Sequence, residues 1–165
     1  MDSKYSVSLD KIIEAHGFEV AYAPEDMKNR AVISPDVSRP GLIFTGFDQY
    51  FDNHRIQFLG AQEMSYIGSF SSEEARARIK KFMSMKPVAV LATRGQNYSD
   101  DFMEFAKEYS VPLLKTKDAT SSCMSAIISY LNIELAPRIT RHGVFVEVHG
   151  EGVLILGESG VGKSE

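Results

Sequence analysis

The strongest chemical signal in the sequence lies in its last residues. A short apolar run, Val153 to Leu156, leads directly into the pattern Gly-x-x-x-x-Gly-Lys-Ser, which occupies Gly157 to Ser164. This pattern is typical of a phosphate-binding loop that comes after a buried strand. Because glycine lacks a Cβ, such a loop can turn its backbone amides inward on a phosphate chain.

Each type of residue in this loop has an expected task. Lys163 would place positive charge on the terminal phosphates of ATP, and the Ser164 hydroxyl would bind Mg²⁺. The candidate nucleotide-binding residues are therefore Gly157, Glu158, Ser159, Gly160, Val161, Gly162, Lys163 and Ser164, with Ser164 also the candidate metal ligand.

A phosphate-binding loop needs further residues on its carboxyl side. A helix N-terminus normally completes the phosphate site, and here that helix would begin between Gly162 and Glu165, where the sequence stops. A later acidic metal ligand and a base for an attacking hydroxyl are not available within the sequence. We therefore expect these 165 residues alone to bind nucleotide poorly and to transfer no phosphate.

His142 is the second candidate for chemistry. A lone histidine before a strand is most often an exposed loop residue. However, His142 precedes the phosphate-loop strand by one hairpin, and an imidazole placed near a phosphoryl group could act as an acid or a base. Both interpretations stay open on the residues alone.

Composition limits the class of protein. The sequence has 44% apolar residues and a formal charge of −4 without a basic block, which argues against nucleic-acid and anionic membrane partners. Cys123 is the single cysteine, so an internal disulfide is excluded and a reducing cytoplasm is the expected location. We interpret Cys123 as a buried apolar residue. Asp48, Asp52 and His54 are residue types that bind metals, but we interpret them as solvated loop residues.

Hydrophobic periodicity predicts alternating strands and helices from about Leu42 to Leu131, and hence an α/β sheet covered by helices. The expected strands are Phe18 to Tyr22, Ala31 to Ser34, Leu42 to Thr45, Arg55 to Leu59, Val88 to Ala92 and Val111 to Leu114. The expected helices are Leu9 to His16, a helix or turn over Ala61 to Ile67, a helix capped by Ser71, Asp100 to Tyr109, and a helix capped by Thr120 or Ser121.

A domain boundary is expected near Pro137, which cannot extend a helix and disfavours helical geometry at Ala136. We predict an accessory α/β domain over residues 1–135. Residues 136–165 would then hold a valine-rich hairpin and the phosphate-binding loop, the start of a second domain.

Two groups of motifs resemble one family, the bacterial HPr(Ser) kinase/phosphorylases, over essentially the whole chain. The junction of that family resembles Arg141-His142-Gly143-Val144 with the valine strand, Gly152 to Ile155, and Gly157 to Glu165. Its N-terminal domain resembles Arg39-Pro40-Gly41-Leu42, Thr45-Gly46-Phe47 and Arg55 to Gly60. Glu147 and His149 depart from the family pattern, where an aspartate and a tyrosine are expected.

The resemblance implies a bifunctional enzyme that phosphorylates a serine of the phosphocarrier HPr with ATP or pyrophosphate. It also implies the reverse phosphorolysis, which yields pyrophosphate, and a role in carbon catabolite repression. Lys163 and His142 would be catalytic, while the acid/base aspartate of the family would lie beyond Glu165. Members form hexamers through the catalytic domain, and their N-terminal domain resembles the uridine-nucleotide-recognition domain of Mur ligases.

Two other interpretations remain. Leu9 to Leu131 could be a ligand-binding or protein-interaction module that precedes another kinase, or the chain could belong to a phosphate-loop ATPase that is not a kinase.

Overall fold

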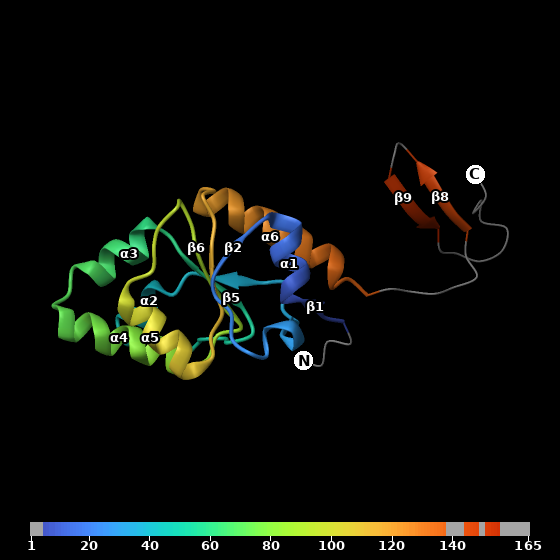
Figure 1. Cartoon of the computed structure of the whole chain (residues 1–165). Coiled ribbons are helices and arrows are strands. Elements are labelled where there is room, and N and C mark those ends of the chain that lie inside the picture. The colour runs from blue at the N-terminus through green and yellow to red at the C-terminus, as the bar shows by residue number, and fades with distance from the viewer. Residues whose placement is uncertain (1–4, 138–143, 149–150, 156–165) are drawn as a thin grey trace.

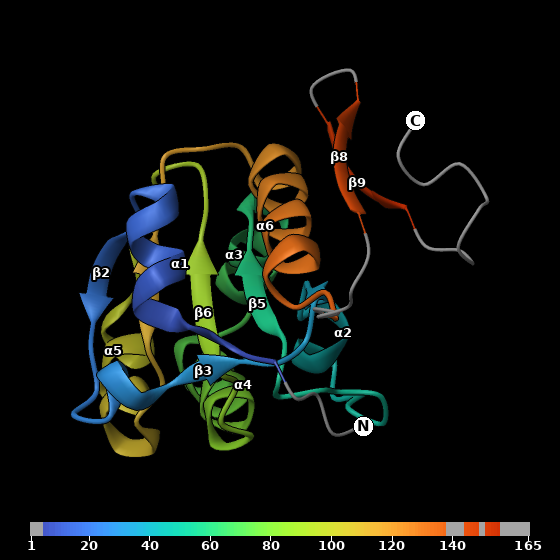
Figure 2. The ribbon, with the colours of Figure 1, turned by 90° about the vertical axis from the view of Figure 1, so that its right-hand side faces the viewer.

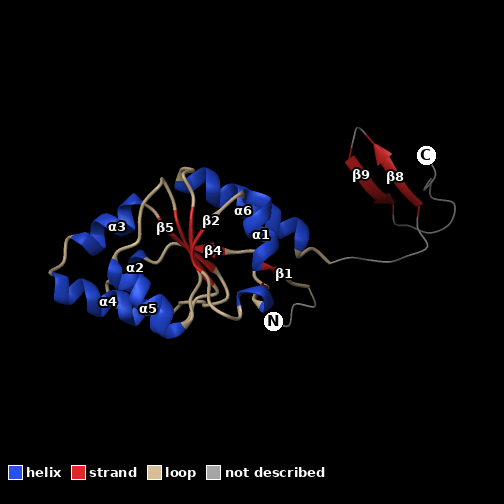
Figure 3. Cartoon of the chain, viewed as in Figure 1, coloured by secondary structure: helices blue, strands red, loops and turns tan. Residues whose placement is uncertain are grey.

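The computed structural model describes residues 5–137, 144–148 and 151–155. Residues 5–137 form a three-layer arrangement in which a five-stranded sheet lies between two layers of helices (Figures 1 and 3). The strand order is β2-β7-β6-β5-β4; β4 to β7 run parallel to one another, and β2 is antiparallel to β7. The predicted α/β sheet covered by helices is confirmed.

The helices and strands are short and alternate along the chain. The strands are β1 (Val7–Ser8), β2 (Glu19–Tyr22), β3 (Ala31–Val32), β4 (Val37–Ser38), β5 (Ile56–Leu59), β6 (Ala89–Ala92) and β7 (Leu113–Lys115), with β1 and β3 forming a separate antiparallel pair. The helices are α1 (Leu9–His16), the 3₁₀ turn η1 (Met27–Asn29), α2 (Gly41–Phe44), α3 (Ala61–Gly68), α4 (Ser72–Ser84), α5 (Asp100–Tyr109) and α6 (Thr120–Glu134).

Alternating side chains of the strands divide the core into two. Phe58 and Leu91 face α1 and α6, the two helices in front of the sheet in Figure 2. Leu59 and Val90 face the opposite layer, made of α2, α3, α4 and α5. All four residues of β6 are fully buried at the centre of the sheet, as its continuous apolar sequence predicts.

Helix boundaries depend on local capping chemistry. The Ser8 hydroxyl accepts a hydrogen bond from the backbone of Lys11 at 3.2 Å, and Gly17 ends α1 in the left-handed conformation with φ 68°. The Ser71 hydroxyl accepts one from the backbone of Glu74, also at 3.2 Å. The predicted bounds of α1 and α5 are confirmed.

Some expectations about secondary structure are wrong, and β7 starts at Leu113 where Val111 was expected. Leu42 to Thr45 is not a strand: α2 turns there, buries Phe44 against Phe82 and leaves Leu42 65% exposed, because four apolar residues can also form one helical turn. The strand expected to reach Ser34 ends at Val32. The N-cap of α6 is Ala119, and the Thr120 hydroxyl, one of the two expected caps, bonds instead to that of Thr93.

The second described unit is an antiparallel hairpin of β8 (Val144–Val148) and β9 (Glu151–Ile155). Val144 is paired with Ile155 and Val148 with Glu151. The predicted valine-rich hairpin is therefore present up to Ile155, and the predicted phosphate-binding loop after it lies outside the described residues.

Candidate functional site

The residues predicted to do chemistry fall outside the described part of the chain. Gly157, Glu158, Ser159, Gly160, Val161, Gly162, Lys163, Ser164 and His142 all lie there. Their roles as nucleotide-binding, metal-binding and catalytic residues therefore stay predictions.

The pairing of β8 with β9 shows at which end of the hairpin the chain continues to His142 and to the phosphate-binding loop. Val144, two residues after His142, is the direct partner of Ile155, two residues before Gly157. Paired Cα atoms of antiparallel strands lie about 5 Å apart, and two residues of chain reach at most about 7 Å. His142 and the start of the loop are thus attached to the same end of one hairpin.

Within the first domain, polar side chains gather where the parallel strands end. In open α/β sheets, ligands bind at this carboxyl edge, in the crevice between neighbouring strands whose connections leave on opposite faces. Here the connection after β6 leads to α5 on one face, and the connection after β7 leads to α6 on the other. The carboxyl ends of β6 and β7 therefore flank such a crevice.

The most buried charged group at this edge is Glu63, with 4% exposure. It accepts a hydrogen bond from the Gly60 amide at 2.6 Å and bonds from Nε and Nη2 of Arg39 at 2.9 to 3.2 Å. A Cβ on Gly60 would come within 2.8 Å of Arg39 Nη2 and Thr120 Oγ1. A larger residue at this position would therefore force the Arg39 and Thr120 side chains to move.

A second set of contacts joins the loops after β6 and β7. The buried hydroxyls of Thr93 and Thr120 are 2.6 Å apart. The amides of Arg94 and Gly95 donate to the carbonyls of Asp118 and Thr116 at 2.8 and 2.9 Å. Arg94 and Gly95 have φ of 57° and 70°, so this turn holds a non-glycine residue in the left-handed conformation.

A cleft of about 340 Å³ lies beside this turn. Its walls come from the α1–β2 turn, the first residue of β2, Gly95, and the end of β7 with the loop after it. The His16 ring lies against Phe18 and Tyr130, and its Nδ1 is 2.9 Å from the Ile12 carbonyl. Because a carbonyl only accepts hydrogen bonds, Nδ1 is the donor in this contact.

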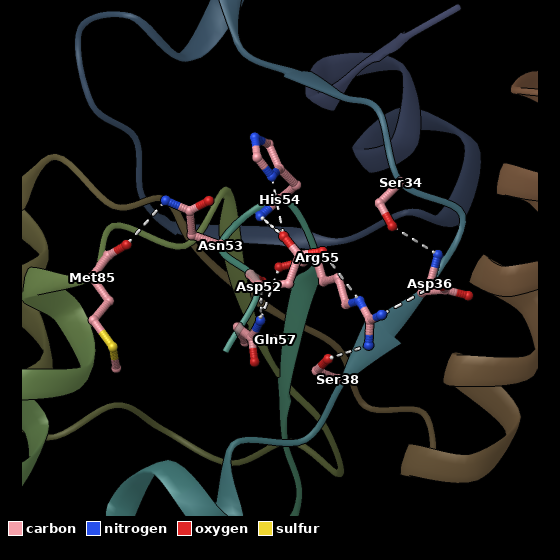
Figure 4. Close-up of polar contacts among 9 residues, drawn as sticks. All are labelled: Ser34, Asp36, Ser38, Asp52, Asn53, His54, Arg55, Gln57 and Met85. Atoms are coloured by element: carbon pink, nitrogen blue, oxygen red, sulfur yellow. Dashed lines mark hydrogen bonds and ion pairs between the residues drawn. The ribbon is translucent and has the colours of Figure 1, made fainter. Parts of the chain in front are cut away.

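A polar network lies at the opposite, amino edge of the sheet (Figure 4). The Arg55 guanidinium is 3.5 Å from carboxylate oxygens of both Asp36 and Asp52, and it donates to Ser38 at 3.4 Å. Asp52 accepts hydrogen bonds from the backbone of His54 at 2.9 Å and from its ring at 3.1 Å. These contacts tie the segment before β5 to β4, so we interpret the network as structural.

The three residues that could have suggested a metal site, Asp48, Asp52 and His54, have different partners in the structure. Asp52 and His54 bind each other, whereas Asp48 is 3.5 Å from Lys81 of α4. Among the described residues, no cluster of three metal-ligating side chains occurs.

Burial acts to raise the pKa of Asp52, but the hydrogen bonds from His54 and the positive charges of His54 and Arg55 outweigh it and lower the pKa below 3.8. A lowered folded-state pKa gives stability that is present above the unfolded pKa and is lost as pH falls through the folded pKa. Asp52→Asn should therefore reduce the free energy of unfolding at pH 6 by less than about 1 kcal/mol, since the carboxylate is 38% exposed. Urea unfolding of both chains should show this difference shrinking below about pH 4; a difference that grows on acidification would contradict it.

The single cysteine is confirmed as a buried residue of α6, with 3% exposure. Burial, with the nearby negative charge of Asp118, raises the pKa of the Cys123 thiol to about 11. Since the thiolate is the reactive form, Cys123 is not poised as a nucleophile.

Sequence reasoning missed both the Arg39–Glu63 contact and the cleft. A signal for the first was present, because Glu63 stands at the third position of a helix that begins after Gly60, where a carboxylate can reach back to the N-cap amide. The cleft had no local signal, since its walls come from segments about 100 residues apart.

Two family models together match nearly the whole chain. The model described as HPr Serine kinase N terminus matches residues 7–131, and the HPr Serine kinase C-terminal domain matches residues 133–165. The chain is 44% identical over 161 residues to the HPr kinase/phosphorylase of Lachnoclostridium phytofermentans and 40% identical to that of Caldicellulosiruptor bescii. It covers 52% of each, so it spans about half the length of these curated relatives.

A solved structure shares the fold. The regulatory region of Clostridium perfringens pyrophosphatase, with its CBS and DRTGG domains, superposes with a TM-score of 0.51 at 19% identity. The match covers 74% of this chain and 46% of that one.

In the described residues, every helix is too short or too polar to cross a membrane. The matches to both parts of the family, with the phosphate-loop pattern in the second, agree with the resemblance seen in the sequence. The chain belongs to the HPr serine kinase family.

Proposed function

We propose that this chain is the amino-terminal part of a bifunctional HPr kinase/phosphorylase. The enzyme transfers a phosphoryl group from ATP or pyrophosphate to a serine of HPr and removes it by phosphorolysis. In this proposal the reaction takes place in the cytoplasm and regulates carbon metabolism through catabolite repression. The observation that carries the proposal is the match of both family models, over residues 7–131 and 133–165.

The donor set of the loop fits a nucleotide phosphate chain with Mg²⁺. Backbone amides of Gly157 to Ser164 would bind phosphate oxygens, Lys163 would neutralise the terminal phosphates, and Ser164 would ligate the metal. When bound, Mg²⁺ supplies charge neutralisation between the phosphates. An ammonium, amides and a hydroxyl are the groups that such a ligand requires.

The hairpin supports a role for His142 in the same site. Val144, which follows His142 by two residues, is paired with Ile155, which precedes the loop by two residues. His142 would then hold or move a proton near the transferred phosphoryl group. The amino-terminal domain would be accessory, and assembly into a hexamer would occur through the catalytic domain.

An HPr phosphorylation assay tests the proposal. A full-length chain, including the whole C-terminal domain, should phosphorylate HPr on serine with ATP or with pyrophosphate, and should release pyrophosphate from phosphorylated HPr in the presence of phosphate. The 165-residue chain alone should do neither, because the chain covers only 52% of its relatives and about half of their length is absent from it. Nucleotide hydrolysis without a phosphorylated HPr product would favour an ATPase instead.

A further inference from the structure

The cleft at the carboxyl edge of the sheet has the position and size of a metabolite site. It lies between the α1–β2 turn and the end of β7, with Gly95 of the loop after β6 on one side. Open α/β sheets bind their ligands outside the carboxyl ends of their strands, the edge at which β7 ends here. A volume of about 340 Å³ is at the small end of the range of ligand pockets, which begins near 300 Å³.

Both signs of charge line this cleft. Glu19 and Asp118 supply carboxylates, and Lys115 and Lys117 supply ammonium groups. Within the described part of the chain, the ten ion pairs include none of these four residues.

Lys115 and Glu19 lie close enough to form an ion pair, yet they do not form one. Glu19 of β2 is the direct cross-strand partner of Lys115. Side chains at such positions are near enough to form an ion pair. The Lys115 ammonium instead donates to the amide oxygen of Asn97, a neutral group in the loop after β6. The Glu19 carboxylate is thereby left at the cleft without an ion-pair partner in the described structure.

We propose that this cleft binds a small zwitterionic ligand of the amino-acid class. Its anionic group meets the ammonium groups of Lys115 and Lys117, and its cationic group meets the carboxylates of Glu19 and Asp118. A ligand that carries both signs gives all four charges a partner, whereas a purely anionic or purely cationic ligand leaves two of them facing a like charge. The site is in the amino-terminal domain and does not depend on the proposed phosphoryl transfer.

Thermal unfolding of the 165-residue chain with each of the twenty amino acids at 10 mM tests the proposal. At least one should raise Tm by about 3 °C or more, and its analogues lacking either the amine or the carboxylate should not. Backbone amide signals of Gly17 and Gly95, which line the cleft, should shift on titration of the same amino acid. Glu19→Gln and Lys117→Gln should each weaken its Kd about tenfold.

Matched controls change the same residue types away from the cleft. Glu25→Gln and Lys28→Gln alter exposed residues of the β2–β3 connection and should leave the Kd unchanged. The proposal is overturned if all twenty amino acids leave both Tm and the two glycine signals unchanged. It is equally overturned if the analogue without the amine binds as tightly as the complete amino acid, which would indicate a simple anion site.

Discussion

Replacing Lys163 by alanine in a full-length chain should lower the rate of HPr phosphorylation by about 10²- to 10³-fold. The lysine of this loop pattern acts on the terminal phosphates, where negative charge must be stabilised in the transition state. Removal of one such preorganised group commonly costs about 3 to 4 kcal/mol of transition-state stabilisation. Because the same phosphates take part in both directions of the proposed chemistry, phosphorolysis of phosphorylated HPr should fall by a similar factor. Initial rates at saturating ATP and at saturating phosphate measure the two effects.

The matched control is Lys107→Ala, which removes an exposed lysine from the last turn of α5. Its rates should stay within about twofold of those of the unaltered enzyme, since Lys107 is an exposed residue of α5 and lies outside the phosphate-loop pattern. If Lys163→Ala retained more than a third of the unaltered rate in both directions, the loop would not be the phosphate site of this enzyme. Thermal unfolding of both variants shows whether a lost rate reflects lost folding.

The sequence predicted those helices and strands in which one pattern of burial continues over the whole element. The continuous apolar run Val88 to Ala92 became β6, which is buried on both faces, and the capped pattern of Leu9 to His16 became α1 with the predicted bounds. Shorter elements escaped prediction. β1 and β4 have two residues each, so they have no periodicity to detect, and only pairing with a neighbouring strand defines them.

The two candidate sites also differ in how well the sequence predicts them. A phosphate-binding loop is a local motif, since its glycines, lysine and serine act from consecutive positions, and one short segment is enough to predict it. The cleft is assembled from His16 at the end of α1, Gly95 after β6 and Lys117 after β7. Nothing in any of these segments alone marks a ligand site. Their convergence depends on the order of strands in the sheet, and especially on β2 lying antiparallel beside β7.

Replacing Glu63 by alanine should lower the free energy of unfolding of the chain by about 3 kcal/mol. The carboxylate is 4% exposed, and its loss leaves both the Gly60 amide and the Arg39 guanidinium without their acceptor. Breaking a buried ion pair commonly costs about 3 to 5 kcal/mol, and the lower end applies because the Arg39 side chain is 38% exposed. Glu63→Gln keeps an acceptor for Gly60 but loses the charge, so it should cost about half as much. Urea unfolding at pH 7 measures both variants.

A double-mutant cycle separates the ion pair from the capping bond. Arg39→Ala leaves the Glu63 carboxylate buried without its cation, yet the bond from the Gly60 amide at 2.6 Å remains. The losses for Arg39→Ala and Glu63→Ala should therefore sum to more than the loss for the double variant, by about 1 to 2 kcal/mol. Glu108→Ala, at an exposed position of α5, should change stability by less than about 0.5 kcal/mol. Strict additivity in the cycle would mean that Glu63 stabilises the fold through the Gly60 turn alone, with Arg39 contributing nothing to it.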